Sequence, residues 1–185
     1  MRRSTWEIPM QTNRYLIAIL PPEPIASYVL TLKEYFRERY NSKGSLNSPA
    51  HITMHMPFEW RIDREDQLIG IFNEFAGKHT SFPIELDGFG SFAPRVIFIN
   101  VKRSQSLQDN QSDLLQHCKR NLKLSNALYR AEPFHPHITV AFRDLKKDRF
   151  LEAWNEFESK PYFAVFEYRK LSMLKHDGKF WREFL

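Results

Sequence analysis

Residues 51–53 read His-Ile-Thr, and residues 137–139 repeat this tripeptide 86 positions later. A second tripeptide, Asn-Glu-Phe, follows each copy, at 73–75 and at 155–157. Two short motifs that recur in the same order, at nearly the same separation, indicate a duplicated unit. The fold is therefore expected to contain two equivalent halves, each carrying one His-x-Thr motif.

The same series of elements surrounds both copies of the motif. Around the first copy, hydrophobic patterning predicts strand, helix, strand, helix and strand at 15–20, 23–40, 50–56, 64–78 and 82–92, with Pro57 ending the third element. Around the second copy it predicts the same five elements at 95–101, 104–126, 136–142, 146–160 and 162–166, followed by strands at 171–175 and 179–184. The repeated unit is β-α-β-α-β, with the motif on its second strand.

The composition is typical of one globular domain. The chain has 185 residues, of which 42% are hydrophobic and 26% charged, and its 16 phenylalanines can fill a sizeable core. This balance argues against disorder, and the length favours one compact domain or two small, closely packed lobes. Together with the repeats, it leads us to expect a single domain over residues 1–185 with two pseudo-symmetric lobes. A net charge of +5 favours anionic partners such as nucleotides or RNA.

Cysteine use and the amino-terminal segment bear on location. The one cysteine, Cys118, excludes an internal disulfide framework and a zinc site built from cysteines alone, and it fits a reducing cytoplasm. The first ten residues carry basic charges but lack the apolar core of a signal peptide, and the apolar stretch at 16–22 is too short to span a bilayer. We therefore expect a cytoplasmic protein without a membrane segment.

The spacing within His-x-Thr matters because residues i and i+2 of a strand face the same side. His51 and Thr53 are expected to point one way, and His137 and Thr139 to do the same in the second repeat. A pseudo-twofold axis would bring the two imidazoles and two hydroxyls to one cleft around an anion. One neutral histidine could then accept a proton from an attacking oxygen while the other, protonated, serves the leaving oxygen. The hydroxyls would donate to phosphate oxygens, and this chemistry requires no metal.

The motifs and their flanks resemble a known family. Pro-Ala-His-Ile-Thr-Met-His-Met-Pro-Phe at 49–58 and Phe-His-Pro-His-Ile-Thr-Val-Ala-Phe-Arg at 134–143 look like the paired HxT motifs of the 2H phosphoesterase superfamily, in particular its 2′-5′ RNA ligase-like branch. The segment 14–23 is similar to the opening strand and following helix of that family, and the resemblance extends to residue 185. It implies a bilobed α+β fold, with two mainly antiparallel sheets around a central cleft and helices outside.

The resemblance also implies an activity and its residues. The expected reaction is metal-independent hydrolysis or transesterification of 2′,3′-cyclic or 2′-5′ phosphate linkages, with RNA ends or cyclic-phosphate nucleotides as substrates and no cofactor. The expected catalytic residues are His51, Thr53, His137 and Thr139, and the candidate substrate-binding residues are Arg143, Phe58, Tyr15 and His135. Arg143 would share the face of His137 if the strand ran unbroken, whereas the aromatic residues could stack a base and His135 would lie at the cleft edge. No obligate protein partner is implied, and a monomer is expected.

Two alternatives remain open at this stage. His51, His55, His135 and His137 could hold a metal if all four faced one side, which would make the protein a metal hydrolase. The cleft could also bind RNA or nucleotides without turnover. The sequence does not say which histidine is the acid and which the base.

Overall fold

The computed structural model describes residues 11–78, 80–124 and 133–185, and in these ranges it contains four α-helices and one eight-stranded antiparallel sheet. This mixed architecture confirms the expected α+β class. The helices are α1 (Ile25–Tyr40), α2 (Glu65–Ala76), α3 (Gln105–Leu122) and α4 (Lys147–Phe157). The strands are β1 (Thr12–Ile19), β2 (Ile52–Arg61), β3 (Phe82–Phe92), β4 (Val96–Val101), β5 (His137–Ala141), β6 (Phe163–Tyr168), β7 (Ser172–His176) and β8 (Trp181–Glu183). No helix in the described ranges is long and apolar enough to cross a membrane.

The chain order of these elements is that of the predicted duplication. β1-α1-β2-α2-β3 forms the first unit and β4-α3-β5-α4-β6 the second, with β7 and β8 after them. One boundary prediction was wrong, because β2 continues past Pro57 to Arg61. Pro57 lies in the irregular segment between the pairs Ile17–His55 and Tyr15–Phe58, and a proline is tolerated where the ladder of strand hydrogen bonds is interrupted.

The strand order is β6-β3-β4-β5-β2-β1-β7-β8, so the motif strands β5 and β2 are neighbours at the centre. In place of two separate sheets, two four-stranded halves join into one sheet where β2 pairs with β5 at Ile52 and Ile138. The neighbouring pairs β1–β2 and β4–β5 extend over more residues, with a register shift in each. The molecule thus has one sheet made of two half-sheets with a narrow connection, where two sheets were expected.

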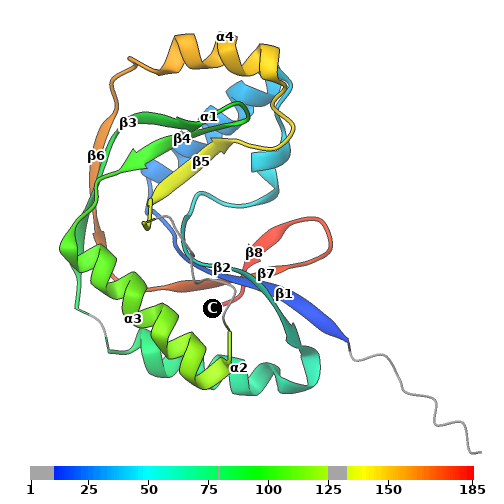
Figure 1. Cartoon of the computed structure of the whole chain (residues 1–185), viewed down its shortest axis with the longest axis vertical. Coiled ribbons are helices and arrows are strands. Elements are labelled where there is room, and N and C mark those ends of the chain that lie inside the picture. Colours follow the sequence, from blue (N-terminus) through cyan, green and yellow to red (C-terminus); the bar gives the residue numbers. More distant parts are fainter. Residues whose placement is uncertain (1–10, 79, 125–132) are drawn as a thin grey trace, which may run out of the picture.

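The two repeats are intertwined in space. β3 belongs to the first repeat but pairs with β4 and β6, in the half that carries the second motif. Helix α1 of the first repeat packs on β5, and α3 of the second repeat packs on β2. Figure 1 shows α1 and α4 at one end with β3, β4 and β5, and α2 and α3 at the other end. Each half of the molecule therefore combines elements from both repeats.

The two faces of the central strands have different surroundings. Ile52 and Ile138 are fully buried in the main hydrophobic core, together with Met54 and Val140. Thr53 pairs with Ala18, and the side chains of a cross-strand pair lie on the same face of a sheet. Ala18 belongs to a smaller apolar cluster that is separate from the main core. The alternation of β2 thus directs Ile52 into the main core and Thr53 to the opposite face.

A loop-to-loop contact holds the segment before the first motif against the end of β5. The carboxylate of Asp144 accepts hydrogen bonds from Ser42 Oγ at 2.9 Å and from the backbone N–H groups of Lys43 and Gly44 at 2.8 and 2.9 Å. Ser45 Oγ donates to the carbonyl of Val140 at 2.7 Å. These bonds fix the approach of the chain to the first motif relative to the second.

Candidate active site

The pairing of Ile52 with Ile138 brings the two motifs together. In an antiparallel pair, the residue before one partner lies opposite the residue after the other. His51 is therefore opposite Thr139, and Thr53 is opposite His137. All four side chains are half-buried, whereas Ile52 and Ile138 are fully buried on the other face. The structure thus brings the four predicted catalytic residues onto one face at the junction of the two half-sheets.

The two histidines are held in the same way. His51 Nδ1 lies 2.9 Å from the carbonyl oxygen of Pro49, and His137 Nδ1 lies 2.8 Å from the carbonyl oxygen of His135. A carbonyl only accepts, so each Nδ1 carries the proton and donates it to the backbone two residues earlier. In its neutral form each ring then has an unprotonated Nε2, which can accept a proton. The two repeats therefore share the tautomer of their histidines as well as their sequence motif.

Both imidazoles are biased toward the neutral form. Burial lowers the pKa of His51 to about 4, and the positive charges of Lys33 and His137 act in the same direction. Burial also lowers the pKa of His137, with His135 contributing. A phosphate bound between the rings would oppose this effect, because an anion favours the protonated form of a histidine.

Lys33 contacts the segment before the first motif and was not among the residues predicted from the sequence. It is 2% exposed and lies in α1, where its Nζ donates to the carbonyls of Ser48 at 2.9 Å and Pro49 at 3.2 Å. Burial lowers its pKa to about 8. The available signal was its place on the apolar stripe of the helix, four residues after Val29 and three before Phe36.

An aromatic group borders the second histidine. The ring of His137 lies 5.2 Å from that of Phe92 and 4.7 Å from that of Phe98, measured between ring centroids. His135 is exposed, and its ring packs beside both phenylalanines. Phe92 is 43% exposed and was not anticipated, since it ends the strand before the β3–β4 turn and no motif marks it.

Two candidate base-stacking residues lie in the core. Tyr15 is 0% exposed and Phe58 is 5% exposed, and their rings stack on each other with centroids 5.9 Å apart. The Tyr15 hydroxyl donates to the carboxylate of Glu65, which Lys175 also contacts. These two residues are therefore core and structural residues, and the expectation that they stack a base needs correction.

The expected placement of Arg143 also needs correction. It assumed that the strand of the second motif runs unbroken to this residue, but β5 ends at Ala141. Arg143 has φ of 57°, in the left-handed region, and its guanidinium lies over the ring of Phe142 at 4.7 Å. Strand alternation therefore does not place its side chain on the face of His137.

The four-histidine metal site does not assemble as imagined. The register of β1 and β2 shifts between Ile17 and Ala18, so that Thr53 pairs with Ala18 but His55 pairs with the core residue Ile17. His55 is 1% exposed, and its ring packs against Phe58. An irregularity of this kind breaks strict alternation, which turns His55 away from the face of His51. Across the described part of the chain, no three His, Cys, Asp or Glu side chains form a metal-binding group.

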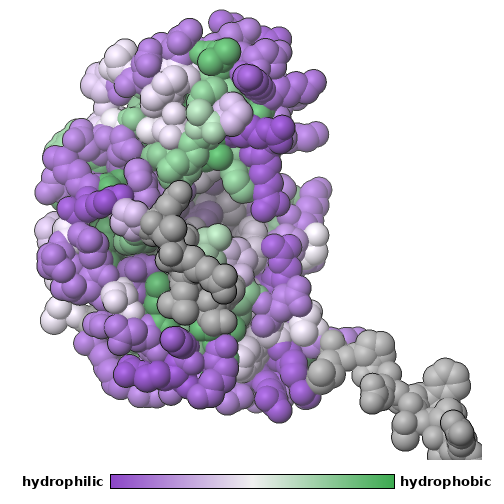
Figure 2. All heavy atoms as spheres, viewed as in Figure 1, coloured by the Kyte–Doolittle hydropathy of each residue, from purple (hydrophilic) through white to green (hydrophobic). Residues whose placement is uncertain are grey.

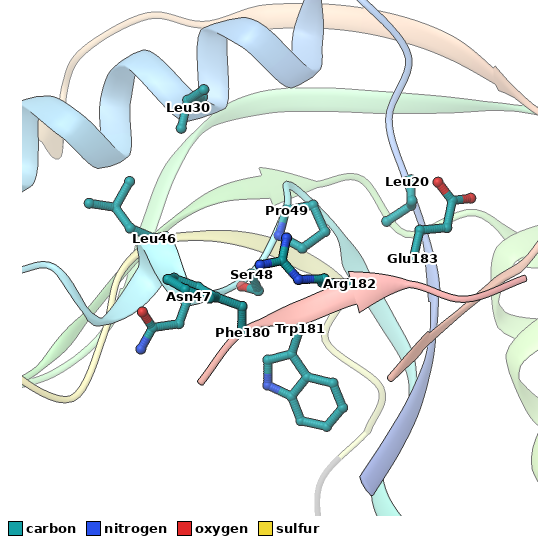
Figure 3. Close-up of a pocket in the computed structure, with 10 residues that line it drawn as sticks. All are labelled: Leu20, Leu30, Leu46, Asn47, Ser48, Pro49, Phe180, Trp181, Arg182 and Glu183. Carbon is teal, nitrogen blue, oxygen red and sulfur yellow. The ribbon is translucent and has the colours of Figure 1, made fainter. Parts of the chain in front are cut away.

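A pocket lies beside the first motif. Its volume is about 460 Å³, and it opens between the β7–β8 hairpin, α1 and the segment that precedes β2. The lining is largely apolar and comprises Leu20, Leu30, Leu46, Asn47, Ser48, Pro49, Phe180, Trp181, Arg182 and Glu183 (Figure 3). Because Ile19 pairs with Ile52, Leu20 is the residue opposite His51. Figure 2 shows a recess between the two halves of the molecule, with polar side chains around much of the surface.

Solved structures share this fold. A crystal structure of E. coli LigT in apo form has 17% sequence identity and a TM-score of 0.63, and the match covers 94% of each chain. The protein TT0787 of Thermus thermophilus has 16% identity and a TM-score of 0.60, over 93% of this chain and 95% of that one. A structure described as a phosphoesterase matches with 17% identity, a TM-score of 0.62 and 94% coverage of both chains. LigT has also been crystallised with 3′-AMP and with phosphate.

Sequence comparison gives the family. No curated protein matches the chain by sequence at a significant level. The sequence profile of the 2′-5′ RNA ligase superfamily, however, matches residues 21–180, which include both motifs and most of the fold. The chain therefore belongs to the 2′-5′ RNA ligase superfamily.

Proposed function

We propose that this protein is a metal-independent phosphoesterase that acts on 2′,3′-cyclic or 2′-5′ phosphodiester linkages of RNA or nucleotides. Membership of the 2′-5′ RNA ligase superfamily supports phosphoester chemistry at the level of the class. The observation that carries the finer proposal is the paired geometry of His51 and His137, each of which donates Nδ1–H to a backbone carbonyl and has Nε2 available for proton transfer.

The reaction follows from two proton transfers. For a 2′,3′-cyclic phosphate, the neutral histidine accepts a proton from water at Nε2 as the water oxygen forms its bond to phosphorus. The bond from phosphorus to one ribose oxygen breaks, and that oxygen takes a proton from Nε2 of the protonated histidine. The product is a ribose phosphate monoester with a free hydroxyl. With a ribose hydroxyl in place of water, the same groups perform transesterification.

Thr53 and Thr139 supply the remaining interactions. The register sets each hydroxyl opposite the histidine of the other motif. A hydroxyl can donate to a non-bridging phosphate oxygen, where negative charge builds up in the transition state. The two threonines are therefore proposed to hold the phosphate between the two imidazoles.

The pocket beside the first motif is the proposed site for a nucleoside. Leu20, Pro49 and Trp181 give it apolar walls, and Asn47 and Arg182 add polar groups. A site of this kind suits an aromatic base with a few hydrogen-bonding edges. Pro49, which lines the pocket, lies two residues before His51. A nucleotide whose phosphate is at the two histidines could therefore extend into the pocket.

The direct test is turnover. Purified protein is incubated with each 2′,3′-cyclic nucleoside monophosphate and with 2′-5′-linked dinucleotides, and the products are separated by chromatography. We expect hydrolysis of at least one substrate that is lost in a double variant, His51→Ala with His137→Ala. Binding of the substrates without turnover would instead support a non-catalytic RNA- or nucleotide-binding module, the alternative from a different class.

A further inference from the structure

Lys33 has unusual surroundings for a charged residue. It is almost fully buried, and no carboxylate of the described residues forms an ion pair with it; its Nζ donates to the carbonyls of Ser48 and Pro49. Burying an ammonium group without a counter-ion is costly, and a neutral side chain at this helix position would avoid that cost. The observation calls for a role other than stability.

The contacts of Lys33 lead to one of the two histidines. The carbonyl oxygen of Pro49 accepts from Lys33 Nζ at 3.2 Å and lies 2.9 Å from His51 Nδ1. Lys33 and the His51 ring therefore share one acceptor. The ammonium polarises the oxygen that holds the ring, and its positive charge opposes protonation of His51.

The second histidine lacks an equivalent contact. The carbonyl of His135 accepts from His137 Nδ1, and among the described residues no lysine or arginine donates to that oxygen. The charge that acts on His137 is that of His135, which is a titratable group and not a fixed charge. Partial burial of its ring and the charge of Arg103 lower the pKa of His135. The two histidines thus match in tautomer but differ in the fixed charge behind them.

The other charged groups around His51 do not provide this asymmetry. His137 faces it from β5, and His51 and His137 repel each other equally when both are protonated. Arg182 and Glu183 of β8 line the same pocket as Ser48 and Pro49. The charges of Arg182 and Glu183 are opposite in sign. Leu20, which directly follows β1, lies opposite His51 by the register and is uncharged. The fixed charge specific to His51 comes from Lys33 of α1.

We propose that Lys33 is a positioning residue that assigns the roles of the two histidines, so that His51 enters hydrolysis neutral as the proton acceptor and His137 enters it protonated as the proton donor. This inference rests on the proposed function, because the roles of proton acceptor and proton donor belong to the proposed hydrolysis. The difference between the rings is a property of the free protein and can be measured without substrate.

The test is a histidine titration by NMR. The ring C–H signals of His51 and His137 are assigned with the variants His51→Gln and His137→Gln, and their pH dependence is followed in wild type, Lys33→Gln and Lys33→Arg. We expect His51 to titrate at lower pH than His137 in the wild type. Lys33→Gln retains a donor but loses the charge, so the His51 curve should move up by about one pH unit. Lys33→Arg retains the charge and should preserve the order.

Kinetics give the second readout. In Lys33→Gln the acid limb of kcat/KM should move to higher pH with His51, which corresponds to an approximately tenfold loss on that limb, while the basic limb stays in place. Lys102→Gln, at an exposed lysine directly after β4, is the matched control. It should change neither the histidine titration curves nor the pH profile of kcat/KM.

Clear results would overturn the inference. Wild-type His137 titrating below His51 would contradict it, and this measurement stands even if every Lys33 variant fails to fold. An unchanged His51 curve in a folded Lys33→Gln would do the same. Absence of turnover with an intact shift of the His51 titration would instead refute the proposed function and leave the effect of Lys33 on His51 established.

Discussion

His51 lies opposite Thr139 across the two central strands, because Ile52 pairs with Ile138. The histidine of each repeat therefore faces the threonine of the other repeat. A phosphate at this junction would be contacted by both repeats at once. Since the half-sheets meet at this pair, a change in their relative position would act directly on the candidate site.

Removal of either imidazole tests the catalytic assignment. His51→Ala and His137→Ala are each expected to lower kcat by about 10²–10⁴, the range for loss of a positioned acid or base. The kcat of the double variant should be only slightly below that of the less active single variant, because both proton transfers belong to the same reaction step. Steady-state kinetics with a 2′,3′-cyclic nucleotide measure this effect, and melting temperatures confirm that the half-buried side chains are not needed for folding. Near wild-type turnover in both single variants would exclude these roles.

Removal of the hydroxyls is expected to cost less. Thr53→Val and Thr139→Val keep the shape of the side chain and remove its donor, so kcat should fall by about 10–10³, as expected for one lost donor to a developing charge. Thr31→Val is the matched control, because this exposed threonine in α1 donates to the carbonyl of Ser27, four residues earlier in the same helix. An equal loss in the control would show that the effect is structural.

The pH dependence follows from the lowered histidine pKa values. Activity requires one neutral ring, so it falls below the pKa of the base, and one protonated ring, so it falls above the pKa of the acid. Burial lowers the pKa of His51 to about 4 and also lowers that of His137. The profile of kcat/KM should therefore be a bell whose summit lies below about 6.5, the ordinary histidine value. A summit well above that value, on the alkaline side of neutrality, would contradict the assignment.

Much of the fold was accessible from the sequence because it is encoded locally. The repeated His-Ile-Thr and Asn-Glu-Phe motifs and the hydrophobic periodicity predicted the element order, and Ile52 and Ile138 lie in the core as alternation requires. The pairing of β3 with β4 and the packing of α1 on β5 depend on contacts between distant segments, which no local pattern specifies.

The errors at the site have physical causes. The register shift next to His55 breaks the alternation of side chains along β2, and the left-handed backbone at Arg143 lies beyond the end of β5. The assumption that residues an even number of positions apart share a face therefore failed at both positions. Phe58 lies on the motif strand β2 and Tyr15 on its neighbour β1, but both side chains are buried in the core. Lys33 was overlooked because a lysine in a helix is usually solvated, and its burial becomes apparent only when the carbonyls of Ser48 and Pro49 are placed next to it.

The pocket proposal predicts a binding defect without a chemical one. Phe180→Ala removes an aromatic wall next to the first motif and should raise KM for a cyclic nucleotide by about tenfold, roughly the effect of one lost stacking contact, with kcat little changed. Phe163→Ala is the matched control, since Phe163 is 65% exposed in β6 at the far edge of the sheet. A fall in kcat with constant KM would place Phe180 outside nucleoside binding.

Removal of metal ions separates acid–base catalysis from metal-assisted hydrolysis. The metal alternative required His55 to join His51, His135 and His137, but His55 is buried against Phe58 and pairs with the core residue Ile17. The proposed reaction needs only proton transfers at two Nε2 atoms and hydroxyl donors. After dialysis against excess EDTA, hydrolysis of a 2′,3′-cyclic nucleotide should therefore proceed at the rate of the untreated protein over the whole pH bell. A metal enzyme would lose turnover in the chelator and regain it on addition of Zn²⁺ or Mn²⁺, and its acid limb would follow protonation of the ligands. Recovery of activity only with added metal would refute the two-histidine mechanism, whereas His55→Ala in a folded protein would still leave a two-histidine enzyme active.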